Sequence, residues 1–426
     1  MRPDQSVSSR SAWTKSDPTP PWMEGPASST DVVFTAEKLL LARMLQSLGG
    51  PPLTMVLWNG EEIAGRGDPL AKVFIRDRGT LLKLVTNPEF WLAEMYVDQR
   101  IEVCGDLVEV IESIYRAMRS ASKGQVLQKR LADFFDKRRH SIEESRRNIY
   151  HHYDIGNEFY RLWLDQQMAY TCAYFPESTT GLEDAQIAKM DHICRKLWLK
   201  PGETVVEAGC GWGAMALHMA RHYGVAVKAF NISREQLAFA RDRARAEGLQ
   251  DRVEFIEDDY RNIRGEFDAF VSVGMLEHVG PPHYPALGEL ISRSLTSTGR
   301  GLIHSIGRDS PGALNAWIER RIFPGAHPPS LAQMMQIFEP AGLSVLDVEN
   351  LRLHYARTLE HWLQRFEASA ERIAAMFDPA FVRAWRLYLA GSTAAFRCGE
   401  MQLFQVVFAR SGGNDIPWTR QHQYPR

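Results

Sequence analysis

The chain has 426 residues, more than the about 100–200 of an ordinary domain, so its length favours two or three domains. A hydrophobic fraction of 45% and a charged fraction of 24%, with 31 Gly and 22 Pro, exclude a low-complexity or collagen-like protein. Lys and Arg number 50 and Asp and Glu 52, and this formal charge of -2 excludes a whole-chain attraction to nucleic acid.

The first part of the chain divides into a tail and a small domain. Residues 1–30 are rich in Ser, Pro, Thr and Asp and offer little to bury, which predicts a disordered tail. Beyond them, Leu39–Leu48 has helical periodicity, and the short apolar runs Met55–Trp58 and Lys72–Ile75 are separated by glycine-containing turns. This alternation predicts a small α+β domain over 31–119.

A basic segment follows, and we expect a helical linker over 120–147. Between Arg116 and Arg147 ten Lys and Arg stand against four Asp and Glu, a local charge of +6. A solvated linker is the ordinary interpretation of such a run. At about 1 kcal/mol per basic residue near an anionic leaflet, the same charge is also sufficient for docking to an anionic membrane surface. Both interpretations stay open.

The next segment that we expect to be helical is Glu183–Trp198. Ile187, Met190, Cys194 and Leu197 fall on one face of this helix. We therefore expect these four side chains to lie in the core rather than in a cofactor site.

Regularly spaced strands follow. Five short runs are apolar and rich in β-branched residues: Thr204–Ala208, Val225–Asn231, Val253–Glu257, Phe267–Val273 and Gly301–Ile306. Most gaps between them are long enough for a helix, which is typical of a parallel, doubly wound sheet. Two later runs, Ser344–Val348 and Leu403–Ala409, flank a helical insertion from about Thr358 to Ala395. The pattern predicts a Rossmann-like, seven-stranded, mostly parallel sheet with helical insertions over 148–412, followed by a tail over 413–426.

A glycine turn follows the first of these strands. Glu207–Ala214 contains three glycines at alternate positions, and Met215–Tyr223 has helical spacing. A strand, a glycine turn and a helix N-terminus together allow a ligand to approach bare backbone amides. Gly209, Gly211 and Ala214 also satisfy the relaxed dinucleotide fingerprint G-x-G-x-x-A.

Two features of the acidic residues decide against a dinucleotide. The dinucleotide pattern needs an acid at the end of the second strand, where this chain has Phe230 and Asn231. An acid instead precedes the glycines, at Glu207, and the pair Asp258 and Asp259 follows the third strand. A carboxylate before the glycines suits a cationic adenosine ligand with an amino-acid ammonium. The turn therefore resembles the first motif of class I S-adenosylmethionine methyltransferases.

The cysteines and the apolar runs indicate the cellular compartment in which we expect the protein. The five cysteines are few, odd in number and far apart: Cys104, Cys172, Cys194, Cys210 and Cys398. They predict neither a disulfide framework nor a metal site. No run approaches the about 18 uninterrupted apolar residues of a membrane span, and the first thirty residues lack an apolar signal-peptide centre. We expect a cytoplasmic protein, soluble or peripheral to the inner face of the membrane.

Segments outside the glycine turn carry a more specific resemblance. They are His152–Asn157, Met168–Phe175, Ser272–Gly280, Leu302–Gly307, Phe396-Arg397 and Gln402–Phe408. On these motifs the chain resembles the cyclopropane-fatty-acyl-phospholipid synthases and the related mycolic acid cyclopropane synthases. The resemblance is strong over about 149–410 and looser over the N-terminal domain, for which it implies a lipid-binding-like role.

The resemblance implies a reaction and an ion site. A methylene unit from S-adenosylmethionine is added to the cis double bond of an unsaturated phospholipid acyl chain in a membrane, giving a cyclopropane fatty acid. The carbocation formed on the way is deprotonated by bound bicarbonate. The positions that hold bicarbonate in the family read Cys172, Glu277, His304, Ile306 through its backbone, and Tyr355, and all keep the family's residue type.

The resemblance also assigns the cofactor-binding positions. Tyr153 and Gly156 form part of a lid, and the remaining positions are Tyr170, Thr171, Glu207, Gly209, Cys210, Gly211, Gly213, Phe230, Asn231, Ile232, Ser233, Gln236, Asp259 and Tyr260. Two of them depart from the family: Glu207 stands where Asp is usual, and Asn231 where Thr is common. The departures alter the expected geometry of the cofactor site but not the identity of the cofactor.

Several alternatives remain open. Relatives in the same superfamily make methyl-branched, methylene or hydroxylated chains, and an enzyme of furan or tuberculostearic-type lipid synthesis would share every contact. A non-catalytic lipid carrier is a rival of a different class, whereas a small-molecule or nucleic-acid methyltransferase would need neither the Cys172 segment nor His304. Because withdrawing ten methylenes into water costs about 8 kcal/mol, we expect an apolar groove facing the membrane, lined by 358–395 and the apolar residues before Pro176. The resemblance also implies a possible homodimer.

Overall fold

The chain folds as two compact units in the computed structural model, which describes residues 20, 22, 33–121 and 155–424. One unit contains the N-terminal region up to residue 128 together with 374–398, and the other contains the remainder. The sequence pattern places 374–398 in the catalytic domain, so the two divisions differ there, and the expected domain boundaries stay a prediction. The expected tail over 1–30 and nearly all of the basic linker over 120–147 lie outside the described residues.

The N-terminal unit is the expected α+β domain. Its strands β1 (Leu53–Val56), β2 (Glu62–Ala64), β3 (Ala71–Ile75) and β4 (Ile101–Cys104) form a sheet in the order β2-β1-β3-β4. Its helices are α1 (Thr35–Ser47), α2 (Arg78–Thr86), α3 (Pro88–Val97), α4 (Leu107–Ala121) and α16 (Pro379–Cys398). β1 begins two residues before the expected run and ends at Val56, because the chain then turns through Gly60 at φ 85°.

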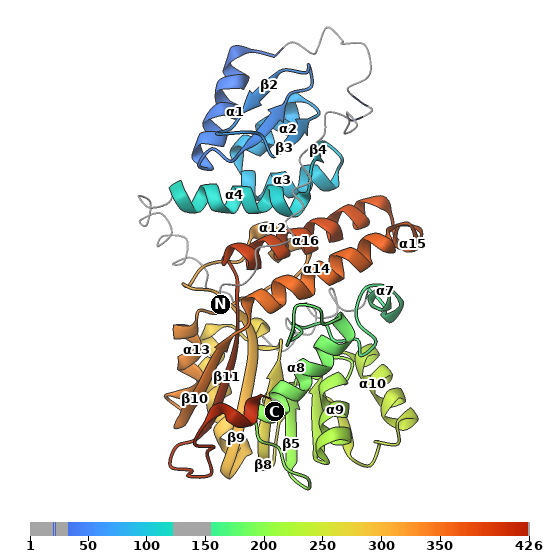
Figure 1. Cartoon of the computed structure of the whole chain (residues 1–426), viewed down its shortest axis with the longest axis vertical. Helices are drawn as coiled ribbons and strands as arrows, with labels where there is room; N and C mark the ends of the chain where they lie inside the picture. Colours follow the sequence, from blue (N-terminus) through green and yellow to red (C-terminus); the bar gives the residue numbers. More distant parts are fainter. Residues whose placement is uncertain (1–19, 21, 23–32, 122–154, 425–426) are drawn as a thin grey trace. The chain divides into compact units, whose positions relative to one another are not determined.

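The catalytic unit contains the seven-stranded sheet that the sequence predicts. The strands are β5 (Thr204–Ala208), β6 (Ala226–Asn231), β7 (Val253–Glu257), β8 (Phe267–Val273), β9 (Leu295–Gly307), β10 (Leu343–Asn350) and β11 (Gln402–Arg410). Their order is β10-β11-β9-β8-β5-β6-β7, and Figure 1 shows β10 to β5 from left to right. β11 is antiparallel to both neighbours, and the other neighbouring pairs are parallel. The Rossmann-like, mostly parallel sheet is confirmed.

The strand order creates a switch point beside β5. The chain passes from β5 to β6 and β7 on one side and then returns to β8 on the other side of β5. In open α/β sheets, the carboxyl ends of strands at such a point border a ligand crevice. The residues that follow β5, β6, β7 and β8 therefore gather at one edge of the sheet.

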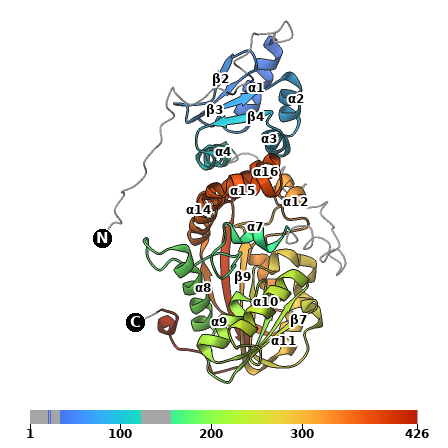
Figure 2. The ribbon, with the colours of Figure 1, turned by 90° about the vertical axis from the view of Figure 1, so that its right-hand side faces the viewer.

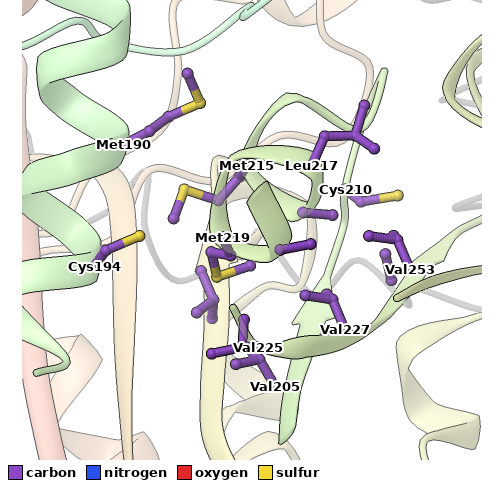
Figure 3. Close-up of a cluster of buried hydrophobic side chains, with 14 of the residues drawn as sticks. Met190, Cys194, Val205, Cys210, Met215, Leu217, Met219, Val225, Val227 and Val253 are labelled. Carbon is purple, nitrogen blue, oxygen red and sulfur yellow. The ribbon is translucent and has the colours of Figure 1, made fainter. Parts of the chain in front are cut away.

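The helices of this unit cover both faces of the sheet. They are α7 (Asn157–Arg161), α8 (Leu182–Lys196), α9 (Ala214–Tyr223), α10 (Arg234–Ala246), α11 (Tyr284–Ser294), α12 (Ala316–Arg321), α13 (Leu331–Phe338), α14 (Arg352–Ala368) and α15 (Ala370–Met376), which crosses the division between the units. One core joins α8, α9 and α10 to the sheet, and a second core joins α11 and α13 to it. Figure 2 presents α9 and α10 toward the viewer. Figure 3 shows Met190 and Cys194 of α8 directed toward Met215 and Met219 of α9.

Helix α8 corrects one expectation. Met190, Cys194 and Leu197 are buried as expected, but Ile187 is 40% exposed. The inward face also carries Gln186, which is fully buried, and this shifts the centre of that face away from Ile187. The expected helical insertion contains α14, α15 and α16, and the last of these begins at Pro379, which cannot continue the preceding helix.

None of the helices within the described residues combines the length and the apolar character that crossing a membrane requires. Within the same residues, no cluster of His, Cys, Asp and Glu side chains could hold a metal ion.

Candidate active site at the carboxyl edge of the sheet

The glycine turn lies between the end of β5 and the start of α9. Gly209, Gly211 and Gly213 have φ values of 85°, 52° and 83°, a backbone region that side chains disfavour. A Cβ at Gly213 would lie 2.7 Å from Cζ of Phe255, so this position also has no room for a side chain. The N–H groups of Gly209 and Cys210 donate to the carbonyl of Phe230, at 2.9 and 3.0 Å, and fix the turn against β6.

Glu207 is a buried acid directly before the turn. The residue is 2% exposed, and its Oε2 has no hydrogen-bond partner among the described residues. Burial raises the pKa of Glu207 to about 8, against the opposing effects of Lys189 and of the Ala216 N–H. A buried carboxylate oxygen without a partner is costly, and a ligand ammonium would satisfy it. These residues therefore fit the amino-acid end of S-adenosylmethionine.

The end of β6 is a network that supports the turn. Asn231 Nδ2 donates to the carbonyl of Gly211 at 3.2 Å and to Gln236 Oε1 at 2.8 Å. Asn231 Oδ1 accepts the N–H groups of Ile232 and Ser233. The side chain of Asn231 is thus already occupied within the protein, and it orders the turn and the start of α10.

The end of β7 joins the same edge. The N–H of Asp258 donates to the carbonyl of Asn231 at 3.1 Å. Asp259 is 3% exposed, and its Oδ1 accepts the N–H of Arg261 at 2.9 Å, which begins the 3₁₀ helix η4 (Tyr260–Asn262). Desolvation raises the pKa of the Tyr260 hydroxyl. The structure therefore brings the expected positions from Glu207 to Tyr260 to one sheet edge.

An aromatic cluster lies beside Tyr170. The ring centroid of Tyr170 is 5.2 Å from that of Trp163, 5.3 Å from Trp362 and 5.5 Å from Tyr160. The ring of Tyr160 also contacts that of Trp212 in the glycine turn, at 5.0 Å. Sequence analysis identified only Tyr170 among these residues, because aromatic side chains on helices look the same in a core and in a site.

The expected lid is described only in part. Gly156 has φ 101° and precedes α7, whose Asn157 Oδ1 accepts the Trp212 Nε1 proton at 2.6 Å. Tyr153 lies outside the described residues.

The expected ion site contains a preformed polar group. Glu277 follows β8 in the 3₁₀ helix η5 (Leu276–His278), and its Oε1 accepts the backbone N–H of Ile306 at 2.6 Å. Oε2 of Glu277 and Nε2 of His304 are buried and have no partner among the described residues. Burial raises the pKa of Glu277 to about 7 and lowers the pKa of His304 well below its ordinary value. With Gln405 Nε2 donating to Nδ1 of the neutral ring, His304 keeps its proton on Nε2.

Cys172 and Tyr355 are the other two residues expected in that site. Cys172 is fully buried, and its Sγ lies 3.1 Å from the carbonyl of Ala173 and 4.0 Å from that of Leu351, which precedes α14. Burial raises the pKa of the Cys172 thiol. Tyr355 lies on α14, is 7% exposed and contacts Trp362 edge-on at 6.0 Å.

Gly274 connects the two parts. Its N–H donates to the carbonyl of His304 at 2.8 Å, and a Cβ built on it would lie 2.9 Å from Cγ2 of Thr171, the residue before Cys172. All five expected ion-site residues therefore belong to segments that meet at this edge of the sheet.

The structure adds polar residues that sequence analysis did not identify. Lys189 and Gln186 point inward from α8, with exposures of 3% and 0%. Lys189 Nζ donates to Thr171 Oγ1 at 2.8 Å, and Gln186 Nε2 donates to the carbonyl of Thr171 at 2.9 Å. The inward face of α8 also carries His192 and Lys196, so nothing in the sequence distinguished Gln186 and Lys189 from residues of a solvated helix.

Comparisons with known proteins agree with this geometry. Residues 140–406 match the family model described as mycolic acid cyclopropane synthetase, and 40–125 match one described only as a domain of unknown function. A "Probable fatty acid methyltransferase" of Pseudomonas putida is 36% identical over 388 residues, covering 88% of this chain and 96% of that protein.

Two further relatives match a smaller share of this chain. The "Cyclopropane-fatty-acyl-phospholipid synthase" of Escherichia coli K12 is 41% identical over 266 residues, 62% of this chain and 68% of that protein. The crystal structure of mycolic acid cyclopropane synthase CmaA1 with SAH and CTAB has a TM-score of 0.59 and 29% identity, covering 62% of this chain and 98% of that one.

Proposed function

Since the chain belongs to the mycolic acid cyclopropane synthetase family and is an S-adenosylmethionine-dependent methyltransferase, we propose that it acts on an unsaturated phospholipid. The proposed reaction adds a methylene unit to the cis double bond of an acyl chain and forms a cyclopropane fatty acid. One observation supports this proposal: Oε2 of Glu277 and Nε2 of His304 are buried without a partner among the described residues, in segments that meet at the cofactor edge.

The cofactor edge has the residues to hold S-adenosylmethionine. Glu207 offers an unpartnered carboxyl oxygen to the ammonium, and the glycine turn leaves open space at Gly211, where an added Cβ would meet nothing within 4 Å. When bound, this cofactor supplies an electrophilic methyl group. The aromatic cluster around Tyr170 contributes apolar walls that exclude water from a cation.

The ion site has the residues to hold bicarbonate. A neutral His304 donates through Nε2, while the Ile306 N–H holds Oε1 of Glu277 and leaves Oε2 of that carboxyl for the ion. Because the pKa of Glu277 is raised to about 7, its carboxyl is protonated in part at neutral pH and can be a second donor. When bound, bicarbonate supplies a base for the proton that the lipid carbocation loses. Cys172 and Tyr355 complete this site in the proposal.

The product has one specific rival. The relative that covers 88% of this chain is called a fatty acid methyltransferase and not a cyclopropane synthase. A methyl-branched, methylene or furan-precursor acyl chain is therefore the second candidate product, formed at the same site from the same lipid. Retention of all five ion-site residue types favours the ring, because a ring requires efficient removal of a proton.

Lipid analysis tests the product. Cells that express the chain should accumulate cyclopropane acyl chains, identified by gas chromatography and mass spectrometry of their lipids. Methyl-branched or methylene chains would select the rival instead. Purified protein should also convert S-adenosylmethionine to S-adenosylhomocysteine on unsaturated vesicles, which a lipid carrier cannot do.

Two variants test the ion site. Glu277→Gln and Cys172→Ser should each lose most of the lipid product, and removal of carbonate from the buffer should slow the wild type. Cys104→Ser is the matched control, because this half-buried cysteine lies on β4 in the other unit. Full activity of both site variants in carbonate-free buffer would contradict the bicarbonate proposal.

Membrane docking is a separate part of the proposal. The basic segment between Arg116 and Arg147 would bring the enzyme to the anionic inner face of the membrane. Alanine at Lys137, Arg138 and Arg139 should then weaken binding to anionic vesicles at low salt and leave binding to neutral vesicles unchanged. Unchanged binding to anionic vesicles would contradict docking through this segment. The homodimer also stays a prediction, checked by analytical ultracentrifugation.

A further inference from the structure

Helix α8 holds the segment 169–171 through two buried polar side chains. Gln186 Nε2 donates to the carbonyls of Ala169, at 3.1 Å, and Thr171, at 2.9 Å. Lys189, one turn further along, donates from Nζ to Thr171 Oγ1 at 2.8 Å. Both the main chain and the side chain of Thr171 are thus fixed from the same helix.

The side chain of Thr171 has one orientation in this setting. Its Oγ1 faces Lys189, and its Cγ2 faces Gly274, where an added Cβ would be only 2.9 Å away. A hydroxyl that accepts a proton from an ammonium keeps its own proton for another acceptor. Among the described residues nothing accepts that proton, and Thr171 is half-buried at the cofactor edge.

Lys189 is an uncommon residue in this position. Its ammonium is 3% exposed and carries three protons, yet Thr171 Oγ1 is its hydrogen-bond acceptor within the described residues. The buried acids Asp165 and Glu207 lie within electrostatic reach of it and keep its pKa at about 8, against burial, which lowers that pKa more strongly. A buried ammonium with unused protons beside a ligand site is suited to an anionic group.

We propose that Lys189 is a positioning residue for the cofactor: it holds the Thr171 hydroxyl so that its proton binds the carboxylate of the cofactor's methionyl end. Glu207 lies in the same region and offers its free oxygen to the ammonium of that end. The ammonium of the amino-acid end is then bound by the Glu207 carboxylate, and its carboxylate by the hydroxyl that the Lys189 ammonium holds. The proposal depends on the cofactor alone, so its failure would leave the lipid substrate and the ion site untouched.

Two ligands that differ only in the amino-acid end separate this role from general support of the fold. S-Adenosylhomocysteine carries the carboxylate, and 5′-methylthioadenosine lacks the whole amino-acid end. Isothermal titration of the full chain should give affinities for S-adenosylhomocysteine that fall at least about tenfold in Lys189→Met and in Thr171→Val, as expected for a lost charge-assisted hydrogen bond. Affinities for 5′-methylthioadenosine should stay within about twofold of the wild type.

Further variants sharpen the test. Thr171→Ser keeps the hydroxyl and should retain the affinity of the wild type. The double variant Lys189→Met/Thr171→Val should bind no more weakly than the weaker single variant, because Lys189 acts through Thr171. Lys196→Met is the matched control: Lys196 is also a buried lysine of α8, but it pairs with Glu349 at 2.6 Å, and its loss should leave the ratio of the two affinities unchanged.

Two results would overturn the proposal. One is full affinity of Thr171→Val for S-adenosylhomocysteine. The other is an equal loss for both ligands in Thr171→Val and Lys189→Met, which would assign these residues to the fold alone. If circular dichroism shows that Lys189→Met does not fold, the comparison of Thr171→Val with Thr171→Ser still decides.

Discussion

Replacing Glu277 by Gln should stabilise the protein as the pH rises, although we expect the same change to remove activity. The carboxyl is 7% exposed, and burial is the largest cause that raises its pKa from 4.5 to about 7. The protein therefore keeps an acid in a place where its charged form is disfavoured. Such a conflict between stability and function is typical of active sites.

The magnitude follows from the two pKa values. Below pH 4.5 the carboxyl is protonated in the folded and the unfolded chain, so the stability of the wild type carries no cost from it. Above pH 7 the folded chain must hold the charge that burial disfavours. At about 1.4 kcal/mol per pH unit, the cost grows by about 2–3 kcal/mol between pH 5 and pH 8. The Gln variant does not titrate and escapes this growing cost.

The Gln variant also loses a pH-independent amount of stability. Oε2 of Glu277 has no partner among the described residues, so the amide of Gln would bury protons without an acceptor. That costs about 1–3 kcal/mol at every pH. The absolute difference between variant and wild type is thus less informative than its change with pH.

Urea unfolding at pH 5, 6, 7 and 8, followed by tryptophan fluorescence, measures that change. Glu183→Gln is the control with a flat profile, because its ion pair with Arg365 lowers the pKa of Glu183 below the usual value of 4.5. The stability that this charge contributes is nearly complete above that value, so this variant should differ from the wild type by about the same amount from pH 5 to pH 8. A difference between Glu277→Gln and wild type that is the same at pH 5 and pH 8 would refute the reasoning.

Three further outcomes are expected. Gly213→Ala should lower the melting temperature and weaken S-adenosylhomocysteine binding, since its Cβ would meet Phe255 at 2.7 Å; wild-type affinity by titration would contradict this. Affinity for S-adenosylhomocysteine should peak near pH 8, because Glu207 must lose its proton and Lys189 must keep one, and both pKa values are about 8. The affinity for 5′-methylthioadenosine should show no such peak. A flat pH profile for both ligands would argue against these roles of Glu207 and Lys189. Asn157→Ala should cost about 1–3 kcal/mol in thermal unfolding, because it removes the acceptor of the buried Trp212 N–H, whereas Asn157→Asp, which keeps an acceptor, should not.

Sequence could predict the sheet because parallel strands covered on both faces appear as continuous apolar runs. The first half of β9 did not appear in this way. It contains Arg300, which is 3% exposed and pairs with Glu203 at 2.6 Å, and a charged residue is rarely assigned to a central strand. The grouping of 374–398 with the N-terminal unit was also beyond the sequence, since it depends on contacts between segments far apart along the chain.

The site could be predicted at positions where the backbone conformation requires a particular residue type. Positive φ values from 52° to 85° favour glycine, so the glycine turn can be recognised in the sequence. Glu277 and His304 belong to motifs on which the family resemblance rests. Lys189 cannot be recognised from the sequence in this way. A lysine on an amphipathic helix is almost always at the surface, so only the fold reveals that this one is 3% exposed and bonded to Thr171.

Burial shifts the pKa values of the ionisable groups at this edge in a common sense. Burial raises the pKa values of Glu207, Glu277 and Cys172 and lowers those of Lys189 and His304, so each group is pushed toward its neutral form. A ligand charge reverses this push in a neighbour of opposite charge and strengthens it in a neighbour of like charge. Binding of a charged ligand at this edge must therefore take up or release protons, and the reason lies in the fold: the carboxyl ends of β5, β8 and β9 bring these groups together under helix α8 without solvent.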